Sequence, residues 1–573
     1  MTGATTFRVD RRLFLGGGLA SLALGVAGCS TERTKAGTTQ SGGAGGATND
    51  GVITVNFVGG VASYYRNWNP FSPAEHTGSG IGYFYEPLLR VNRYKGFVAE
   101  PWLAEKWEIN DAHNELTFHL RKDVKWSDGE PFTADDVVYT LKVPQTYAKT
   151  NLVLPNFGIK EVTKVDDHTV KVIMNEPKYG HLIGLGVTNI YPEHIFSKQD
   201  LEKWTNESPV STGPWKLGTF SPQQVKLSHR DDYWGGTFPN VKECRWAVFG
   251  NEDSGKALVK QGKIDMATMS WPNAKTSLVD QGPGNDYQVY PTGGGEALLY
   301  NCAKAPLDEA AVRRAITNTI DFVKVMSLYE IGLESANVTG MAESVWGDKI
   351  APEFKGKTIT QDLDAAKKEL AGAGWSVKDG KLTKAGKSYH LTLKTVAEYT
   401  NWATWSDGIK EQLKTGLGLD IAVLKVPNDQ LAEQITKGDF DIVMDFAGGG
   451  SLLSDFYATG NAGMRKSDVV PIGKAAGANA MRFANDEASD ALDKMAVSLD
   501  EAEITSLCQQ VQRVVVSERP FVTYDCAGNF LEMSGKKWKG LPQAADLPDY
   551  VPVPYGNPDT TLLFKDLSPS GNS

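Results

Sequence analysis

The first 29 residues determine which part of this chain folds and in which compartment. A polar start leads to Arg11 and Arg12, and an apolar run rich in small residues follows at 16–27. That run of about a dozen apolar residues is shorter than the roughly 20 that a membrane-spanning helix needs. It ends at Cys29, in the sequence Val-Ala-Gly-Cys. We therefore expect residues 1–28 to be a signal peptide that is removed and takes no part in the fold.

The same segment predicts how the mature chain is held at a membrane. The paired Arg11 and Arg12 before Leu-Phe-Leu resemble a twin-arginine export signal, and the four residues ending in Cys29 resemble a lipobox. We predict export, cleavage before Cys29 and acylation of that cysteine at the outer face of the cytoplasmic membrane. No later stretch is apolar and long enough to be a membrane span. The lipid is therefore expected to be the sole attachment.

Residues 29–51 are predicted to be the lipidated cysteine and a flexible linker. They are rich in Gly, Thr and Ser and bury too little apolar surface to fold. A linker of about 20 residues lets the body lie roughly 25 Å from its anchor. Residues 1–28 carry three arginines against one aspartate, so their removal takes the formal net charge from −10 to −12. An acidic body argues against nucleic acid as a partner.

The roughly 520 residues that remain exceed what one hydrophobic core usually supports, so at least two lobes are expected. Residues 52–58 and 116–120 alternate between apolar and polar side chains, which is typical of strands. Residues 133–141 begin with a helix cap, and 504–517 have helical spacing. Strands that alternate with helices in this way predict α/β lobes.

Cysteine and histidine patterns set limits on covalent and metal chemistry. Cys29 belongs to the lipobox, which leaves Cys244, Cys302, Cys508 and Cys526. Four cysteines allow three complete pairings, and the sequence does not choose among them or decide whether any bridge forms. Metal-binding spacings such as Cys-x-x-Cys and His-Glu-x-x-His are absent, so we expect no metal and no cofactor.

Several segments resemble one known family, and their order and spacing hold from about residue 52 to residue 560. The densest is 103–137, which reads as a strand, a Ser-Asp-Gly-Glu-Pro turn and a helix. Thr-Gly-Pro-Trp at 212–215, Leu-Tyr-Asn at 299–301 and Gly-Asp-Phe-Asp at 438–441 follow. Together these segments resemble the family 5 extracellular solute-binding proteins, which serve peptide, nickel and oligosaccharide importers.

The resemblance implies an α/β fold, a two-lobed clamp like that of periplasmic binding proteins, with an extra subdomain in the first lobe. It assigns 52–90, 200–295 and 522–566 to lobe I, 91–199 to the subdomain, and 296–521 to lobe II. The chain would cross between the lobes near 293–300 and 518–526, and ligand binding would close them by a hinge motion. It also implies a monomer that catalyses no reaction and delivers its ligand to an ABC permease in the membrane.

Fourteen tryptophans are many for a chain of this length, and some of them are candidates for ligand contacts. Trp68 lies in a turn-rich loop beside Asn69, and Trp271 precedes a proline. Trp402 and Trp405 open a helix after a strand end, where α/β proteins place ligands. We predict that these residues contact the ligand, and the alternative for each is local packing.

The segment after the Gly-Asp-Phe-Asp strand is a second candidate. It contains Phe446, Gly448, Gly449 and Asp455. Peptide-binding members of the family often carry Asp-Pro here, and its acidic residue meets the peptide's amino terminus. This chain lacks Asp-Pro and looks more like the oligosaccharide-binding members, although Asp455 remains a candidate ammonium anchor. The glycines let the backbone approach a ligand closely, or merely make a turn.

Oligosaccharide and oligopeptide both stay open as ligands. Flat indole faces beside Asn and Asp suit sugars, whereas peptides need their charged termini met by opposite charges. We therefore favour an oligosaccharide slightly. A secreted glycosidase is a remote third hypothesis, because it needs two carboxyls about 5–10 Å apart that a sequence cannot place. Neither Gly-x-Ser-x-Gly nor a P-loop occurs, which argues against serine hydrolases and NTPases.

Overall fold

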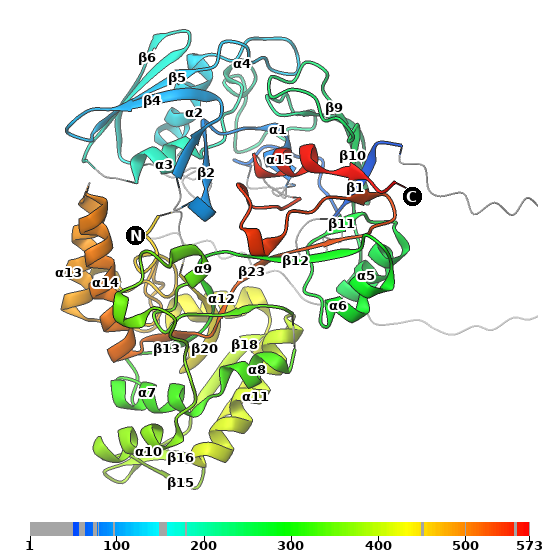
Figure 1. The fold of residues 1–573 in the computed structure, drawn as a ribbon. Helices are drawn as coiled ribbons and strands as arrows, with labels where there is room; N and C mark the ends of the chain where they lie inside the picture. Colours follow the sequence, from blue (N-terminus) through cyan, green and yellow to red (C-terminus); the bar gives the residue numbers. More distant parts are fainter. Residues whose placement is uncertain are drawn as a thin grey trace, which may run out of the picture. The chain divides into compact units, whose positions relative to one another are not determined.

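The computed structural model describes residues 50–56, 63–72, 77, 80–95, 98–147, 157–177, 180–329, 331–448, 452–498, 500–554 and 558–571. Arg11, Arg12, Cys29 and Gly449 lie outside the described residues, as does nearly all of the predicted linker. The described residues belong to one unit of the chain, Ala47–Ser573. Within it, the helices and strands group around separate sheets (Figure 1).

The sheet of lobe I is mixed, and its strands come from both ends of the chain. Its order among the described strands is β12-β23-β11-β1-β10-β9-β8, with β1 (Val52–Val55) parallel to both β10 and β11. The other strands are β8 (Trp215–Ser221), β9 (Gln224–His229), β10 (Glu243–Ala247), β11 (Met266–Ala267), β12 (Asp286–Pro291) and β23 (Gly528–Met533). All four side chains of β1 are buried, as expected for a strand inside a sheet.

Short helices and turns complete lobe I. They are α1 (Ile81–Phe84), α5 (Glu252–Gln261), α6 (Ala274–Ser277), η4 (Val279–Gln281), η7 (Ala544–Asp546), α15 (Asp559–Asp566) and the strand pair β24 (Trp538–Lys539) and β25 (Ser568–Pro569). Asn251 caps α5 by accepting a hydrogen bond from the Ser254 amide at 2.9 Å, which satisfies a free donor of the first turn.

The segment 89–196 forms its own antiparallel sheet in the order β4-β5-β7-β6. Its elements are β2 (Leu89–Asn92), η2 (Arg93–Lys95), β3 (Val98–Pro101), β4 (Ala104–Ile109), β5 (Glu115–Leu120), α2 (Ala134–Thr146), β6 (Ile159–Asp166), β7 (Thr169–Met174), α3 (His181–Gly186) and α4 (Glu193–Phe196). In β5 and β7 every second side chain is buried, so one face packs on the core. This core is continuous with that of lobe I, and the segment is therefore a subdomain of that lobe.

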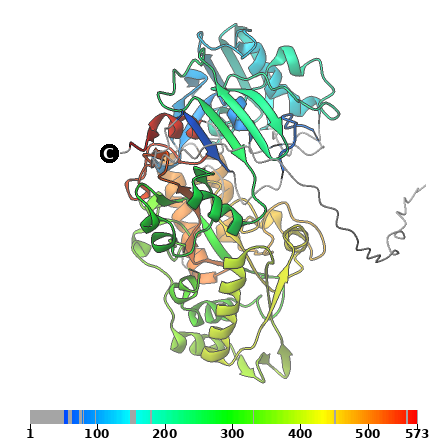
Figure 2. The same ribbon diagram turned by 90° about the vertical axis from the view of Figure 1, so that its right-hand side faces the viewer.

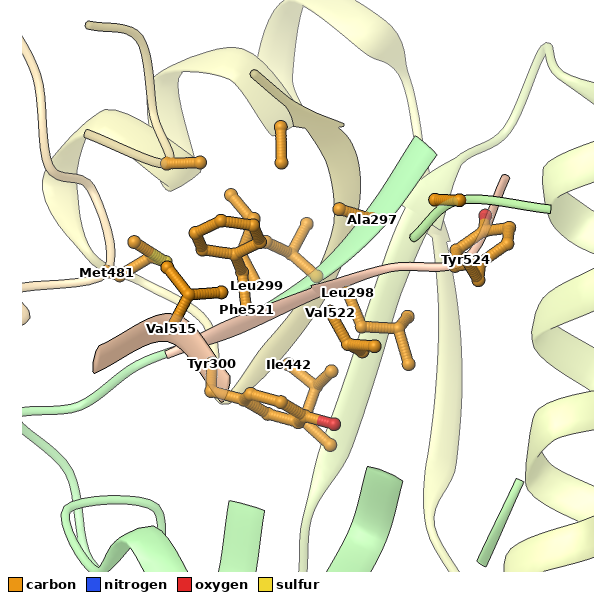
Figure 3. Packing of buried hydrophobic residues seen from close by; sticks show 14 of the residues in the cluster. Ala297, Leu298, Leu299, Tyr300, Ile442, Met481, Val515, Phe521, Val522 and Tyr524 are labelled. Carbon is orange, nitrogen blue, oxygen red and sulfur yellow. The ribbon is translucent and has the colours of Figure 1, made fainter. Parts of the chain in front are cut away.

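Lobe II has a separate core around a sheet in the order β19-β18-β20-β13-β21. Its strands are β13 (Gly295–Tyr300), β18 (Thr392–Val396), β19 (Ala422–Val426), β20 (Ile442–Ala447) and β21 (Phe521–Thr523). Every side chain of β13 is buried, because the strand lies between β20 and β21. Figure 3 shows Leu298 beside Val522 on one face of these strands and Leu299 beside Phe521 on the other.

Helices surround the sheet of lobe II, and the pair α13 and α14 lies side by side in both views (Figures 1 and 2). The helices are α7 (Ala310–Thr319), α8 (Phe322–Ser327), α9 (Glu343–Trp346), η5 (Pro352–Phe354), α10 (Leu363–Gly372), α11 (Thr400–Leu417), α12 (Asn428–Lys437), η6 (Lys466–Asp468), α13 (Asp486–Val497) and α14 (Glu501–Glu518). Small strands are β14 (Glu334–Ser335), which pairs with β22 (Asp525–Cys526), and β15 (Ser376–Lys378), β16 (Lys381–Lys384) and β17 (Lys387–Tyr389).

The four cysteines of the body are free. Cys244, Cys508 and Cys526 are buried and Cys302 is half-buried, and no disulfide joins any two of them. Of the helices that the structure describes, none combines the length and the apolar composition that a membrane span requires.

Two neighbouring segments carry the chain between the lobes. The antiparallel pair β12 and β23 lies in lobe I, and its continuation, the pair β13 and β21, lies in lobe II. Between them the Thr292 amide donates to the Ala527 carbonyl at 2.9 Å, and the Ala527 amide donates to the Gly294 carbonyl at 3.0 Å. The crossing is therefore a hydrogen-bonded two-stranded ribbon. β13 begins at Gly295, one residue before the predicted boundary of lobe II.

The ribbon requires glycine where it approaches other backbone. A Cβ atom at Gly295 would lie 1.7 Å from the Asp525 carbonyl oxygen, and one at Gly294 would lie 2.4 Å from the carbonyl oxygens of Ala447 and Gly448. Since backbone atoms cannot rotate away as a side chain can, neither position accommodates a larger residue without moving a strand.

This geometry predicts a large difference between two glycine substitutions. Gly295→Ala should lower the free energy of unfolding by about 1–3 kcal/mol or prevent folding, because the methyl group overlaps backbone. Gly372→Ala is the control. Gly372 ends α10 with nothing within 4 Å of its added Cβ, and alanine favours a helix by up to about 1 kcal/mol. Urea unfolding followed by tryptophan fluorescence measures both, and equal midpoints would contradict the close approach.

Candidate functional site

A cavity of about 580 Å³ lies between the subdomain of lobe I and lobe II. This volume is typical of pockets that bind small molecules. Aromatic and aliphatic side chains form most of its wall: Tyr94, Val98, Trp107, Ile109 and Leu182 from the subdomain, and Trp346, Leu452, Leu453 and Ile504 from lobe II. A relative motion of the two parts would open or close this space.

Charged groups meet at one part of the cavity wall. Lys349 Nζ lies 2.6 Å from Glu501 Oε1 and 3.4 Å from Asp348 Oδ2. One lysine thus faces two carboxylates, so this part of the wall keeps a net negative charge. The rest of the wall is mostly apolar and suits an apolar group.

The segment that follows β20 places one aromatic side chain within reach of a ligand. The Phe446 side chain is 48% exposed, and its ring centroid lies 5.1 Å from that of Trp402. Trp402 is itself buried, between Phe446 and Tyr399. Of these two predicted residues, Phe446 is therefore the one whose ring is open to solvent. Trp402 packs against the buried side of that ring.

Three predicted tryptophans and Asn69 are core residues in this structure. Trp68 has no exposed surface and meets Phe84 and Phe220 edge to face, at 5.6 and 5.8 Å between centroids. Asn69 is fully buried, and its amide nitrogen donates to the carbonyls of Leu201 and Trp204.

Trp271 and Trp405 are also held by contacts within the protein. The Trp271 indole donates to Ser277 Oγ at 2.8 Å, and Trp405 meets Tyr524 edge to face. The faces of Trp68, Trp271 and Trp405 are occupied by protein, so a sugar has no room to stack on them here. The sequence left local packing open as the alternative for each of these tryptophans, and burial favours packing for Trp68, Trp271 and Trp405.

The glycine run connects the candidate segment to the crossing ribbon. Gly448 has a φ of +78°, and its Cβ would lie 2.3 Å from the Phe456 ring and 3.1 Å from the Gly294 Cα atom. The glycine is therefore required for close packing inside the protein, as well as for the turn. Asp455 is half-buried, and its amide donates to the Leu452 carbonyl at 3.1 Å.

Three buried carboxyl groups were not among the predicted site residues. Asp525 and Glu532 are fully buried and Glu296 is nearly so, and oxygens of all three lack a hydrogen-bond partner among the described residues. Burial raises the pKa of Glu532 to about 8, although the nearby Met269 amide lowers it. Burial and the neighbouring Glu296 carboxyl raise the pKa of Asp525 well above its usual range.

A fourth carboxyl, Asp445, lies beside Phe446 at the end of β20. Burial raises its pKa, and its Oδ2 atom accepts a hydrogen bond from the Asn461 amide group at 2.8 Å. Buried carboxyls with raised pKa values are uncommon away from functional sites, because an uncompensated buried charge is costly. A hydrogen-bond donor or an organic cation would satisfy such carboxyls. The described residues hold no cluster of three or more metal-binding side chains.

Comparisons with known proteins agree with this architecture. The family described as bacterial extracellular solute-binding proteins, family 5 middle, matches residues 98–465. A probable D,D-dipeptide-binding periplasmic protein of Escherichia coli K12 is 25% identical over 459 residues, which cover 77% of this chain and 81% of that protein. A putative ABC transporter peptide-binding protein of Brucella ovis is 24% identical over 526 residues, which cover 89% and 92%.

Solved structures show the same fold. A periplasmic oligopeptide-binding protein of an ABC transporter from Thermotoga maritima superposes with a TM-score of 0.80 at 23% identity, over 90% of this chain and 99% of that one. A mannohexaose-bound structure of an oligopeptide-binding protein from the same organism gives a TM-score of 0.74 at 23% identity, over 91% and 99%. The predicted α/β clamp is confirmed. The chain belongs to the family 5 bacterial extracellular solute-binding proteins, and it is a binding protein rather than an enzyme.

Proposed function

We propose that this protein captures an oligopeptide outside the cell and delivers it, as a monomer, to an ABC permease while a lipid on Cys29 holds it at the membrane. The cavity of about 580 Å³ between the subdomain and lobe II carries this proposal. Its walls come from the subdomain on one side and from lobe II on the other. Closing the lobes would therefore bury a ligand, and opening them would release it.

The choice of peptide over sugar rests on which side chains are available. The sequence favoured an oligosaccharide because of four tryptophans and because the segment after the Gly-Asp-Phe-Asp strand lacks Asp-Pro. Three of the tryptophans are occupied by core contacts. An apolar cavity wall suits peptide side chains, and buried carboxyls suit an amino group. The peptide-binding relatives from Escherichia coli and Brucella ovis favour the same class.

An oligosaccharide remains the second candidate. The half-exposed Phe446 ring, supported by Trp402, is a surface on which a sugar ring would stack. The Thermotoga maritima structure with mannohexaose shows that a protein of this fold holds a hexasaccharide.

Native mass spectrometry of freshly purified protein tests the proposed ligand class directly, because a closed clamp retains its ligand. We expect added mass that corresponds to short peptides, and thermal stability that rises by about 2.7 kcal/mol when the peptide is present at 100 times its dissociation constant. Bound hexose units would favour the second candidate instead. Cleavage of added oligomers would contradict a binding protein.

Two aromatic substitutions separate ligand contact from core packing. Phe446→Ala should weaken ligand binding by about 2 kcal/mol or more, roughly thirtyfold, with little change in stability. Trp68→Ala should lower the free energy of unfolding by about 3–5 kcal/mol, because it empties a packed site. The folded fraction of Trp68→Ala should bind normally. Isothermal titration measures the binding of both variants, and urea unfolding measures their stability. Impaired binding by folded Trp68→Ala would show that Trp68 contacts the ligand.

The lipid anchor is tested at the cysteine and at the arginine pair. Cys29→Ser should move the protein from the membrane fraction to the soluble exported fraction, since the acylated thiol is lost. Replacing Arg11 and Arg12 with lysines should stop export. Fractionation followed by immunoblotting measures both, with Cys302→Ser as a control that should leave the location unchanged. Unaltered membrane association of Cys29→Ser would contradict the anchor.

A further inference from the structure

The register of the lobe II sheet places Glu296 between two aromatic residues. Glu296 of β13 lies directly opposite Phe446 of β20, and its carbonyl accepts a hydrogen bond from the Tyr524 amide at 3.1 Å on the other side. Residues directly opposite each other in a sheet project from the same face. Phe446 contacts Trp402 and Tyr524 contacts Trp405, and both tryptophans belong to α11. The Phe446, Glu296 and Tyr524 side chains therefore form one row beneath α11.

Asp525 joins this row at the crossing ribbon. The Glu296 amide donates to Asp525 Oδ1 at 3.0 Å, and the two side-chain carboxyls are in contact. Glu296 Oε2, Asp525 Oδ2 and the Tyr524 hydroxyl are all buried and lack a hydrogen-bond partner among the residues described. The two carboxyls and the Tyr524 side chain are neighbours, and each of the three side chains is at most 5% exposed.

The surroundings of this carboxyl pair contain no positive charge to balance it. Across the described residues, no lysine, arginine or histidine forms an ion pair with Glu296 or Asp525. The titratable groups that face the pair are Tyr524, Cys526 and, across the β14–β22 ladder, Glu334. The pair therefore requires either a shared proton or a cation from outside the chain.

We propose that Glu296 and Asp525, together with the Phe446 ring and the Tyr524 hydroxyl, form the anchor for the ammonium group of the ligand. This inference rests on the proposed peptide function and assigns the peptide's amino terminus to the crossing ribbon, rather than to Asp455. An ammonium group donates three hydrogen bonds, which matches the free acceptors of two carboxyls and one hydroxyl. Aromatic faces attract organic cations, and the half-exposed Phe446 marks where the group enters.

Binding of an ammonium group at this anchor should be coupled to the release of a proton. Without a ligand, burial and mutual repulsion keep a proton on the pair, and the pKa of Asp525 is raised accordingly. An ammonium group replaces that proton and leaves both carboxyls ionised. Peptide binding should therefore release up to one proton. Affinity should rise with pH, by at most about tenfold per pH unit, for as long as the free pair is protonated.

The test uses the full exported protein and a synthetic tetrapeptide library, offered with free and with acetylated amino termini. Isothermal titration in two buffers of different ionisation enthalpy measures affinity and the number of protons released. We expect the free library to bind with proton release, and the acetylated library to bind about ten- to a hundredfold more weakly without it. Glu296→Gln should reduce affinity for the free library by a similar factor and abolish proton release.

Controls separate this inference from folding and from the proposed function. Glutamine at 296 keeps a donor for Asp525, so Glu296→Gln should fold, and Asp525→Asn provides a second variant with the same expected loss. Glu487→Gln removes an exposed carboxyl on α13 and should leave binding unchanged. Equal binding of both libraries, with no effect of Glu296→Gln or Asp525→Asn, would overturn the anchor and leave peptide binding standing. Failure of both libraries to bind would overturn the proposed function and the anchor with it.

Discussion

The two-stranded ribbon between the lobes is the constraint on which the rest of the structure depends. It continues the pair β12 and β23 of lobe I as the pair β13 and β21 of lobe II, so each sheet includes strands that lead directly to the other. Backbone hydrogen bonds between Thr292, Gly294 and Ala527 hold the two segments together where neither sheet does. A hinge of this kind can bend at a few residues while both sheets keep their registers.

Next to the same ribbon lie buried carboxyl groups, which are unfavourable in a hydrophobic core. A buried carboxyl pair without a cation lowers stability, and an apolar pair of similar size would often be neutral or better. Glu296 and Asp525 nevertheless lie there, beside a Tyr524 hydroxyl that has no hydrogen-bond partner in the described part of the chain. Proteins keep unfavourable buried groups most often at functional sites. A site whose carboxyls are satisfied only when a cation binds is one physical explanation for such a pair.

Much of the fold could be predicted from the sequence, because its signals are local or follow one family pattern. Alternation in 116–120 and the cap at Thr133 correspond to β5 and the start of α2. The ligand residues could not be predicted in the same way. Trp68 stands in a turn-rich loop, yet Phe84 and Phe220, which bury it, come from other elements. The pairing of residues 296, 446 and 525 exists only in the folded sheet, so no local spacing indicates it.

The glycines of the ribbon bring the cavity wall and the candidate segment after β20 into contact through packing. Gly448, next to the ligand segment, lies against Gly294, and an added Cβ at Gly293 would lie 2.8 Å from the indole nitrogen of Trp346. Trp346 lines the cavity, and its ring meets that of Phe456, which also packs against Gly448. The cavity wall, the ligand segment and the ribbon are thus in direct contact. Because a packed interior deforms in discrete steps, a ligand that shifted Trp346 or Phe446 would, under the proposed function, change which arrangement of the ribbon packs best.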